Sequence, residues 1–542
     1  MESKTVRPGK YQVNIFTALF VFMPVIVSGI IILICASKNG FFALPGIKWN
    51  DEADYLQLIR IMHSSLQPDG YFGFNGNHAI LGTGSAWNPA VFFPYFIFSF
   101  IIPTGPSFVF IVNLILMVLA NVSFFLLVRP AIKNQVKLVL LQAASPLTVL
   151  YLCTGMTEIF RFSLAIVLAG IFWNMFFTDS KKWIKYILAP LVLIYAVQVY
   201  TFFAFAIPIY VYALLKNLKK RRKSLSFLIS IAATALVGGG SYYFLHLISS
   251  NYNIGKTETL LADLSSGHIL TAVADFFRMV KDGLSGLWGL KNYVRVYPLY
   301  PGMVIFFAIL VIYGLILMLE SSRHDRKRKP ESRKRDGVIG KIVVYSVLVY
   351  VGMYVTLYTI VPDTFIRGTF IVVVFAVYLL AMVDYRRVVT MIFLMSVIVL
   401  SMARPQFNDF LSARFMTSAT VKNWNDLRTD LSEAVESCDE PAALISGDKE
   451  SELYANTVMM YTMEPKVIAS MPTSLGLNFV LEDDIFVEEA GYMFFTKRPE
   501  AERRADWVDK DYDFYLSEYG ERIEDEYTVV YESDDYIMYA RK

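Results

Sequence analysis

Charged residues and cysteines are both scarce in this sequence. Asp, Glu, Lys and Arg make up 18% of its 542 residues, whereas a soluble globular protein carries about a quarter. The three cysteines, Cys35, Cys153 and Cys438, stand far apart in the chain. No Cys/His group has the spacing of a zinc site. The sequence therefore indicates neither a disulfide scaffold nor a zinc-binding domain.

The missing charge is distributed unevenly along the chain. Up to Arg404 there are 17 acidic and 37 basic residues, and after it there are 30 acidic and 13 basic residues. A strongly acidic tail does not suit a protein that binds nucleic acid, so we expect no such partner. The contrast predicts two regions, a membrane domain over residues 1–404 and an acidic soluble domain over residues 405–542.

Hydrophobic residues are abundant in the first region. They make up 55% of the whole chain, and the mean hydropathy is +0.47. The run 184–216 is too long for one span and has Gln198 and Tyr200 at its middle, so we divide it into a hairpin of two short spans. The pattern predicts an all-α polytopic membrane protein with about eleven transmembrane helices, in apolar runs near residues 13–36, 107–128, 135–153, 157–177, 184–216, 225–248, 299–320, 341–361, 366–384 and 387–403.

Basic clusters predict how these spans are oriented, because Lys and Arg gather in cytoplasmic loops. All the clusters fall on one side if the short apolar stretch 90–102, which contains Pro94, does not cross the membrane. The N-terminus and a basic loop at 321–341 are then cytoplasmic, and the C-terminal domain is extracytoplasmic. The outer segments are 37–106, 153–157, 249–298 and 361–367. We expect a multi-pass protein of a bacterial plasma membrane.

The first outer loop carries three carboxylates, Asp51, Glu52 and Asp54, about 15 residues after the first span. The apolar residues that follow, from Tyr55 to Met62, recur at helical spacing and predict an amphipathic helix on the membrane surface. Two interpretations stay open. The acidic residues cap the helix and favour its dipole, or one of them is a general base or metal ligand held above the bilayer.

The rest of this loop is rich in Gly, Asn and aromatic residues, from Gly70 to His78, and continues through Trp87, Asn88 and Pro89. This composition is typical of loops that contact carbohydrate, and equally of an ordinary turn-rich loop. Tyr55, His78 and Asn88 are candidate substrate contacts.

Further candidates are charged residues at the outer ends of spans. Glu158 and Arg161 stand one helical turn apart, either as a simple interfacial ion pair or as part of a site. Arg278, Arg295 and Arg367 are cations on the outer side and candidate ligands for a phosphate group, since a guanidinium binds phosphate through two parallel hydrogen bonds. The alternative for Arg367 is a side chain that reaches back to the interface or pairs with Asp363.

The order of these features over roughly residues 10–250 resembles the GT-C superfamily of membrane glycosyltransferases, which includes protein O-mannosyltransferases and the aminoarabinose transferase of lipid A. The shared features are a first span, an outer loop with an early Asp51-Glu52 pair, a surface helix, an Asn88-Pro89 turn and a string of spans. Many members carry a doubled proline or His-Pro where this chain has Asn-Pro.

The resemblance implies an inverting transfer of sugar from a polyprenyl-phosphate donor to a glycan, lipid or protein acceptor on the outer face. It implies Asp51 as the main catalytic carboxylate, either a base or the ligand of a divalent cation, with Glu52 supporting it and Glu158 as a second acidic position. The alternatives are a polymerase or ligase of lipid-linked glycans, a polysaccharide or lipid transporter, and a sensor. A transporter would be expected to carry charges deep in its spans and internal repeats.

The acidic tail alternates helical and strand patterns, which predicts a small α/β domain. We expect a helix over Val421–Val435 and strands over Ala442–Ser446, Val467–Ser470, Tyr492–Thr496 and Tyr527–Tyr539, the last with a turn at residues 533–535. This region contains no His, and we expect it to bind an acceptor or partner.

Overall fold

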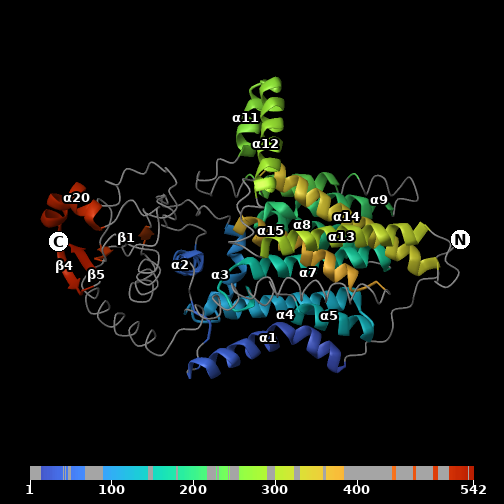
Figure 1. Ribbon diagram of the computed structural model, residues 1–542, viewed down its shortest axis with the longest axis horizontal. Coiled ribbons are helices and arrows are strands. Elements are labelled where there is room, and N and C mark those ends of the chain that lie inside the picture. The colour runs from blue at the N-terminus through green and yellow to red at the C-terminus, as the bar shows by residue number, and fades with distance from the viewer. Residues whose placement is uncertain are drawn as a thin grey trace.

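The structure is a computed structural model of the chain. It describes residues 14–40, 50–66, 89–105, 107–144, 151–178, 181–216, 231–241, 256–289, 299–322, 330–357, 362–383, 442–446, 468–470, 492–497, 512–534 and 536–542, with isolated positions 42, 44–46, 228 and 243. Long helices run side by side along the molecule, and a small sheet with one helix lies beyond α2 at one end of it (Figure 1). The predicted helix Val421–Val435 and span 387–403 lie outside the described residues.

Long apolar helices in the described part agree with an integral membrane protein. Five are long and apolar enough to cross a membrane, at Ile15–Lys38, Phe108–Val128, Glu158–Phe177, Val304–Ser322 and Pro330–Thr356. Shorter apolar helices cover Ile184–Val199, Thr201–Lys216, Ile231–Ser241 and Gly368–Leu380. The total of about eleven spans stays a prediction.

Capping residues fix both ends of the first helix. The first, α1 (Ile15–Asn39), is capped by Asn14, whose side chain accepts hydrogen bonds from the amides of Phe16 and Thr17, and it ends at Gly40 in the left-handed conformation. Such caps satisfy backbone groups that have no partner within the helix. The other helices of the first half are α2 (Asn50–Ser65), η2 (Pro89–Val91), α3 (Phe93–Ser99), α4 (Phe108–Val128), α5 (Ile132–Ala144) and α7 (Glu158–Phe177).

The predicted hairpin at 184–216 is present. The chain forms η3 (Ile184–Leu188) and α8 (Ala189–Val199), breaks at Tyr200 in an extended conformation, and continues as η4 (Thr201–Ala206) and α9 (Ile207–Lys216). The Tyr210 hydroxyl on α9 donates to the Lys185 carbonyl at 3.2 Å, so the two arms lie antiparallel. The stretch 90–102 forms only η2 and the seven-residue α3, which is too short to span.

The later helices differ from the expectation in two places. The segment 249–298, expected to be a loop, forms a helical hairpin of α11 (Lys256–Ser265) and α12 (Ile269–Gly289). After α13 (Leu299–Ser322), α14 (Pro330–Leu357) begins inside the basic segment 321–341, which was expected to be a loop. Pro330 suits the first position of a helix, and the Arg335 guanidinium lies 5.8 Å from the Trp173 ring, so these turns have partners in the bundle. Helix α15 (Pro362–Leu380) follows.

The C-terminal part is a five-stranded mixed sheet in the order β2-β1-β3-β5-β4. The strands are β1 (Ala442–Ser446), β2 (Ile468–Ser470), β3 (Tyr492–Thr496), β4 (Tyr527–Glu532) and β5 (Tyr536–Arg541). β1 pairs in parallel with β2 and β3, and the other pairs are antiparallel. The predicted strands are therefore confirmed in their described parts, the last of them as the antiparallel pair β4 and β5, and the helix α20 (Tyr512–Glu526) was not predicted.

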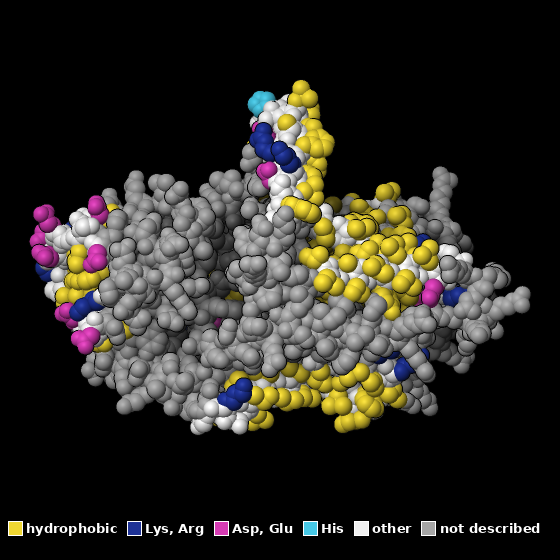
Figure 2. Space-filling view, viewed as in Figure 1, with side chains coloured by type: hydrophobic (Ala, Val, Ile, Leu, Met, Phe, Trp, Pro, Cys, Tyr) yellow, Lys and Arg dark blue, Asp and Glu magenta, His cyan; other side chains and the backbone are white. Residues whose placement is uncertain are grey.

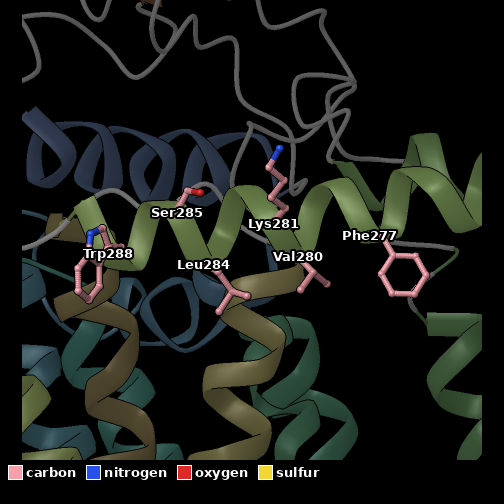
Figure 3. A pocket seen from close by; sticks show the side chains of 6 residues that line it. All are labelled: Phe277, Val280, Lys281, Leu284, Ser285 and Trp288. Atoms are coloured by element: carbon pink, nitrogen blue, oxygen red, sulfur yellow. The ribbon is translucent and has the colours of Figure 1, made fainter.

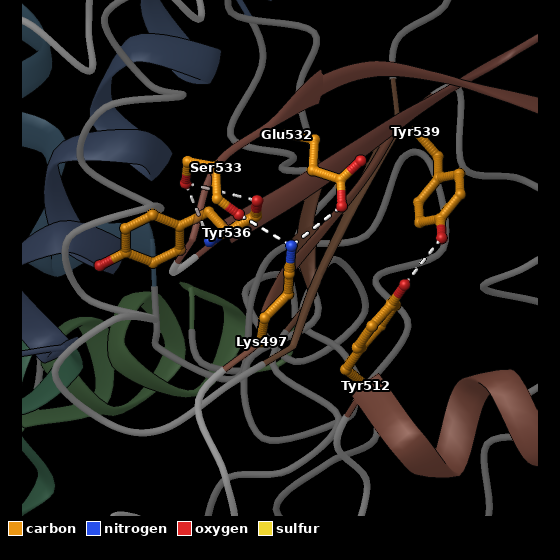
Figure 4. Close-up of polar contacts among 6 residues, drawn as sticks. All are labelled: Lys497, Tyr512, Glu532, Ser533, Tyr536 and Tyr539. Carbon is orange, nitrogen blue, oxygen red and sulfur yellow. Dashed lines mark hydrogen bonds and ion pairs between the residues drawn. The ribbon is translucent and has the colours of Figure 1, made fainter.

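Polar contacts fasten α20 and the β4–β5 turn to this sheet (Figure 4). The Lys497 ammonium at the end of β3 donates to the Glu532 carboxylate and to the Ser533 carbonyl, each at 2.9 Å. The hydrogen bond to Glu532 raises the pKa of Lys497. The hydroxyls of Tyr512 and Tyr539 lie 2.9 Å apart, and burial followed by this hydrogen bond raises the pKa of Tyr539. Both contacts therefore persist at neutral pH.

Helices α13 and α14 approach closely at two glycines. A Cβ atom added to Gly340 would lie 2.5 Å from the Gly314 carbonyl oxygen, whereas one added to Gly352 on the same helix would meet nothing within 4 Å. Small residues allow such close helix packing in membranes.

We therefore expect Gly340→Ala to destabilise the bundle by about 1–3 kcal/mol, the usual cost of overpacking, while Gly352→Ala leaves stability unchanged. Thermal unfolding of the purified protein in detergent measures both. Equal melting temperatures for the two variants would contradict the close crossing.

Candidate active site

A buried carboxylate joins the outer helix α2 to the bundle. The Glu52 side chain is 1% exposed, and its Oε1 accepts a hydrogen bond from the Gly155 amide at 2.6 Å. A buried carboxylate is costly unless it is hydrogen-bonded, and a bond from a backbone N–H to a charged acceptor is among the stronger ones. Glu52 therefore fixes the N-terminal turn of α2 against the turn that precedes α7.

The apolar face of α2 explains why the helix lies there. Tyr55, Leu56, Ile59 and Met62 recur at helical spacing and are buried, as the sequence predicts for an amphipathic helix. The Tyr55 ring centroid lies 5.6 Å from that of Phe92. Tyr55, a predicted substrate contact, is thus placed in the packing between α2 and the turn leading into α3.

The turn at residues 153–157 is held by amide and hydroxyl side chains. The Asn113 amide nitrogen on α4 donates to the carbonyls of Thr154 and Met156, at 3.3 and 2.9 Å. The Tyr95 hydroxyl on α3 donates to the Asn113 side-chain oxygen at 2.6 Å. Burial, and then the charge of Glu158, raises the pKa of Tyr95 well above its ordinary value, so this hydroxyl remains a donor at neutral pH.

The first turn of α7 carries the two other predicted charges. Glu158 and Arg161 are both buried, and their Oε1 and Nη1 atoms lie 3.8 Å apart. The Arg161 guanidinium also lies 4.6 Å from the centre of the Tyr200 ring, a cation–π contact. Tyr200 stands at the break between α8 and η4, so the interruption of that apolar run places an aromatic ring beside the charge.

Helix α15 packs against Tyr200 at a glycine, Gly368. A Cβ atom added to Gly368 would lie 2.6 Å from both the Tyr200 and the Tyr350 hydroxyl oxygens, so the α15 backbone lies directly against these two tyrosines. Arg367 precedes Gly368 in the same helix. The structure describes the backbone of Arg367 but not its side chain. Segments far apart in sequence, from α2, α7, the Tyr200 break and α15, therefore meet at one end of the bundle.

The other predicted site residues have varied positions. Asp51 belongs to the first turn of α2, and its side chain lies outside the described residues. His78, Asn88 and Arg295 also lie outside them. Arg278 lies on α12, is 71% exposed and pairs with Asp275 at 2.9 Å. No described contact joins Arg278 to the cluster around Glu52.

The histidine on α2 has a hydrogen-bonding partner on α3. His63 on α2 lies 2.9 Å from the Ser99 hydroxyl oxygen, and that hydroxyl donates to the Phe96 carbonyl. These contacts join the C-terminal ends of α2 and α3. Within the described residues there is no group of three or more His, Cys, Asp or Glu that could hold a metal ion. The Asp51 side chain lies outside the described residues, and a cation at Asp51 stays a proposal.

Sequence reasoning identified Glu52, Glu158 and Arg161, and it missed Asn113, Tyr95 and Gly368. One signal was available, because Asn113 is a polar residue inside an otherwise apolar run. Such residues in spans usually face the protein interior and have partners there. Gly368 gives no comparable signal, because its importance depends on tyrosines that are distant in the sequence.

The site belongs to an integral membrane protein whose helical bundle precedes a small α/β domain. No family model matches the chain, and no curated protein matches it. Solved structures with a similar arrangement include the Archaeoglobus fulgidus oligosaccharyltransferase in complex with Zn and sulfate, with a TM-score of 0.43, 13% identity, and coverage of 96% of this chain and 73% of that one.

Another similar structure is ArnT from Cupriavidus metallidurans bound to undecaprenyl phosphate, with a TM-score of 0.43, 10% identity, and coverage of 97% of this chain and 98% of that one. A third is the oligosaccharyltransferase AglB from Archaeoglobus fulgidus with an inhibitory peptide and a dolichol-phosphate, with a TM-score of 0.42, 12% identity, and coverage of 89% and 69%. At these TM-scores and identities, neither a function nor the role of any residue transfers to this chain.

The network around Asn113 gives a direct test of the site's framework. We expect Asn113→Leu to destabilise the protein by about 1–3 kcal/mol, because the Tyr95 hydroxyl and two carbonyls lose a buried hydrogen-bond partner. Ser123→Ala on the same helix is the control, since its exposed hydroxyl bonds only to Leu119 of α4 itself. Thermal unfolding in detergent measures both, and parental stability in Asn113→Leu would refute the anchoring role.

Proposed function

We propose that this chain is a membrane glycosyltransferase that moves a sugar from a polyprenyl-phosphate donor to an acceptor on the outer face of the membrane. The observation that carries the proposal is the docking of α2 by the buried Glu52 onto the turn before Glu158 and Arg161. This contact holds Asp51, the neighbouring residue, at the end of the bundle where α7 and α15 meet the Tyr200 break.

The proposed reaction is a substitution at the anomeric carbon of the donor sugar. An acceptor oxygen attacks the anomeric carbon of the sugar, the bond from that carbon to the phosphate oxygen breaks, and polyprenyl phosphate leaves. The proton of the acceptor hydroxyl must be removed, or its oxygen polarised, during the attack. We assign this role to Asp51, as a base or as the ligand of a divalent cation, with inversion at the anomeric carbon. Glu52 is a positioning residue, because its carboxylate bonds to the Gly155 amide.

Helical register supports the choice of Asp51 over Asp54. Position 51 precedes the buried Tyr55 by four residues and the buried Leu58 by seven, so by helical register it lies within the arc of buried positions on α2. Position 54 precedes the buried Leu58 by four residues, so it lies at the edge of that arc. The two aspartates therefore form a matched pair for a mutational test.

We assign the donor phosphate to Arg367. Its neighbour Gly368 touches the hydroxyls of Tyr200 and Tyr350, and Arg161 lies over the ring of the same Tyr200. Arg161 is engaged with Glu158 and Tyr200, and we assign to it the role of fixing this end of α7. His78, Asn88 and Arg295 remain candidate contacts of the sugar or the acceptor, and the C-terminal domain remains a candidate site for the acceptor.

The position of buried charge favours an enzyme over a transporter. Among the described residues, the buried charged side chains are Glu52, Glu158, Arg161 and Asp336. Glu52 lies in the first turn of α2, and Glu158 and Arg161 lie in the first turn of α7. Asp336 lies in the second turn of α14. A transporter is expected to bind its substrate near the bilayer midplane, whereas these charges stand toward the ends of helices.

The Asp51 assignment predicts a large loss of activity with an unchanged fold. Asp51→Asn keeps the side-chain shape and can still cap a helix, and we expect turnover to fall by about 10²–10⁴-fold, the range for lost acid–base assistance. Asp54→Asn should retain most of the activity. Mass spectrometry of surface glycans, in cells that carry either variant, the parent protein or none, measures the product.

Matched amounts of folded protein in the membrane are the control for this comparison. If Asp51→Asn restores the glycan as well as the parent protein does, the carboxylate only caps the helix and the assignment is wrong. If cells with and without the parent protein have the same surface glycans, the proposed activity itself fails.

The orientation has its own test. We expect a cysteine at Ser517 on α20, which is exposed, to react in intact cells with a reagent that does not cross membranes. A cysteine at Glu331, at the exposed start of α14, should react only after the membrane is opened. Both are placed in a variant without the three native cysteines, and the opposite labelling pattern would reverse the topology and remove Asp51 from the outer face.

A further inference from the structure

The hairpin of α11 and α12 projects sideways from the bundle. In Figure 1 both helices run across the direction of α4, α7 and α13, near the end of the bundle that faces the C-terminal sheet. Their connection is tight, since Gly267 has a φ of +77° and the His268 amide bonds to the Asp263 carbonyl. If the bundle helices cross the membrane, a hairpin transverse to them lies parallel to the membrane plane.

Helix α12 has a separate apolar face that is largely exposed. Leu270, Val273, Phe277, Leu284 and Trp288 recur at helical spacing, and their exposure ranges from 47% to 86%. Large exposed apolar patches mark surfaces that meet a partner or a membrane. The buried positions of α12 lie on a different face, where the Gly283 backbone packs directly against the Val355 carbonyl of α14.

The polar side chains of α12 point the other way. Asp275, Arg278 and Asp282 lie on another side of α12, and Lys281 and Ser285 stand at the border between that side and the apolar face. Figure 3 shows Phe277, Val280, Leu284 and Trp288 on the side of the helix toward the bundle, and Lys281 and Ser285 on the side away from it. These six residues line a shallow groove of about 490 Å³.

The apolar face of α12 is continuous with the apolar surface of the bundle, and this continuity indicates that lipid covers both. In Figure 2 the hydrophobic side of the hairpin faces along the apolar surface of the bundle and continues into it, while its charged side chains face the C-terminal sheet. A lipid that surrounds the bundle would therefore also meet this face. The polar face carries two acids and two bases, of which Asp275 and Arg278 form an ion pair at 2.9 Å, so it offers no net attraction to anionic headgroups.

We propose that α12 is an in-plane membrane helix, whose apolar face enters the acyl chains of the leaflet nearest the C-terminal domain. Amphipathic helices of this kind bury their apolar face about 5–10 Å into the boundary between headgroups and acyl chains. Trp288 then lies at the interface, where tryptophan is favoured, and Lys281 extends its amine toward the headgroups. The groove along Phe277, Leu284 and Trp288 receives the upper part of an acyl chain. This inference is independent of the catalytic proposal.

The test places a nitroxide spin label at Phe277→Cys or at Asp282→Cys on the opposite face, in the full-length protein without its native cysteines, reconstituted into phosphatidylcholine vesicles. We expect the ratio of accessibility to oxygen over accessibility to a water-soluble nickel chelate to be several-fold higher at 277 than at 282. Because the polar face has no net charge, the ratio should not change when phosphatidylglycerol is added.

Other outcomes would overturn the proposal. Equal access of the nickel chelate to both labels means that the hairpin stands in water. Exclusion of both reagents at 277, together with dipolar broadening between labels, means that a second copy of the chain covers the face. A ratio at 277 that rises only with phosphatidylglycerol means that charge, rather than apolar surface, brings the helix to the membrane.

Discussion

The hydrogen bond between the Glu52 carboxylate and the Gly155 amide is the contact on which the geometry of the site depends. A carboxylate buried without partners would cost several kilocalories per mole, so α2 can take this position only if a donor meets it. The donor belongs to the turn at residues 153–157, which is itself held by Asn113 and Tyr95. One network therefore fixes the outer helix, the turn and the start of α7 together.

The same principle explains how polar groups are distributed through the bundle. Its interior contains neutral amides with partners on neighbouring helices, such as the Asn121 side chain, which bonds to Gln142 and to the Phe20 carbonyl. In hydrocarbon such groups hold helices together at little cost when satisfied. Glu52, Glu158 and Arg161 stand at helix ends instead. Among the described residues, buried charge is thus kept toward the ends of the helices, at the edge of the apolar region.

Aromatic rings and glycines decide how closely the helices around the site approach. Gly368 lets the α15 backbone touch the Tyr200 and Tyr350 hydroxyls, and Gly283 lets α12 cross α14 at the Val355 carbonyl. Tyr200 serves two neighbours, because its ring faces Arg161 and its hydroxyl faces α15. A break in one helix therefore connects the charged end of α7 with the start of α15.

Local patterns in the sequence determined the elements whose cause is local. Strand patterns predict β1 and β3 with their observed bounds, and a polar residue in an overlong apolar run predicts the break at Tyr200. Helical spacing of apolar residues predicts α2. The same spacing is present in α12 (Ile269–Gly289) and in α20, at Tyr512, Tyr515, Tyr519 and Ile523. These two helices were missed because charged residues in the first and tyrosines in the second hide the pattern.

The candidate site divides in the same way. The sequence by itself identified the acidic pair and Glu158–Arg161, because a charge beside an apolar span is visible without a structure. Only the tertiary structure decided that Glu52 bonds to Gly155, 103 residues away, and that Gly368 meets Tyr200. Such contacts depend on how distant helices pack, and the residues of each partner carry no local pattern that specifies the other.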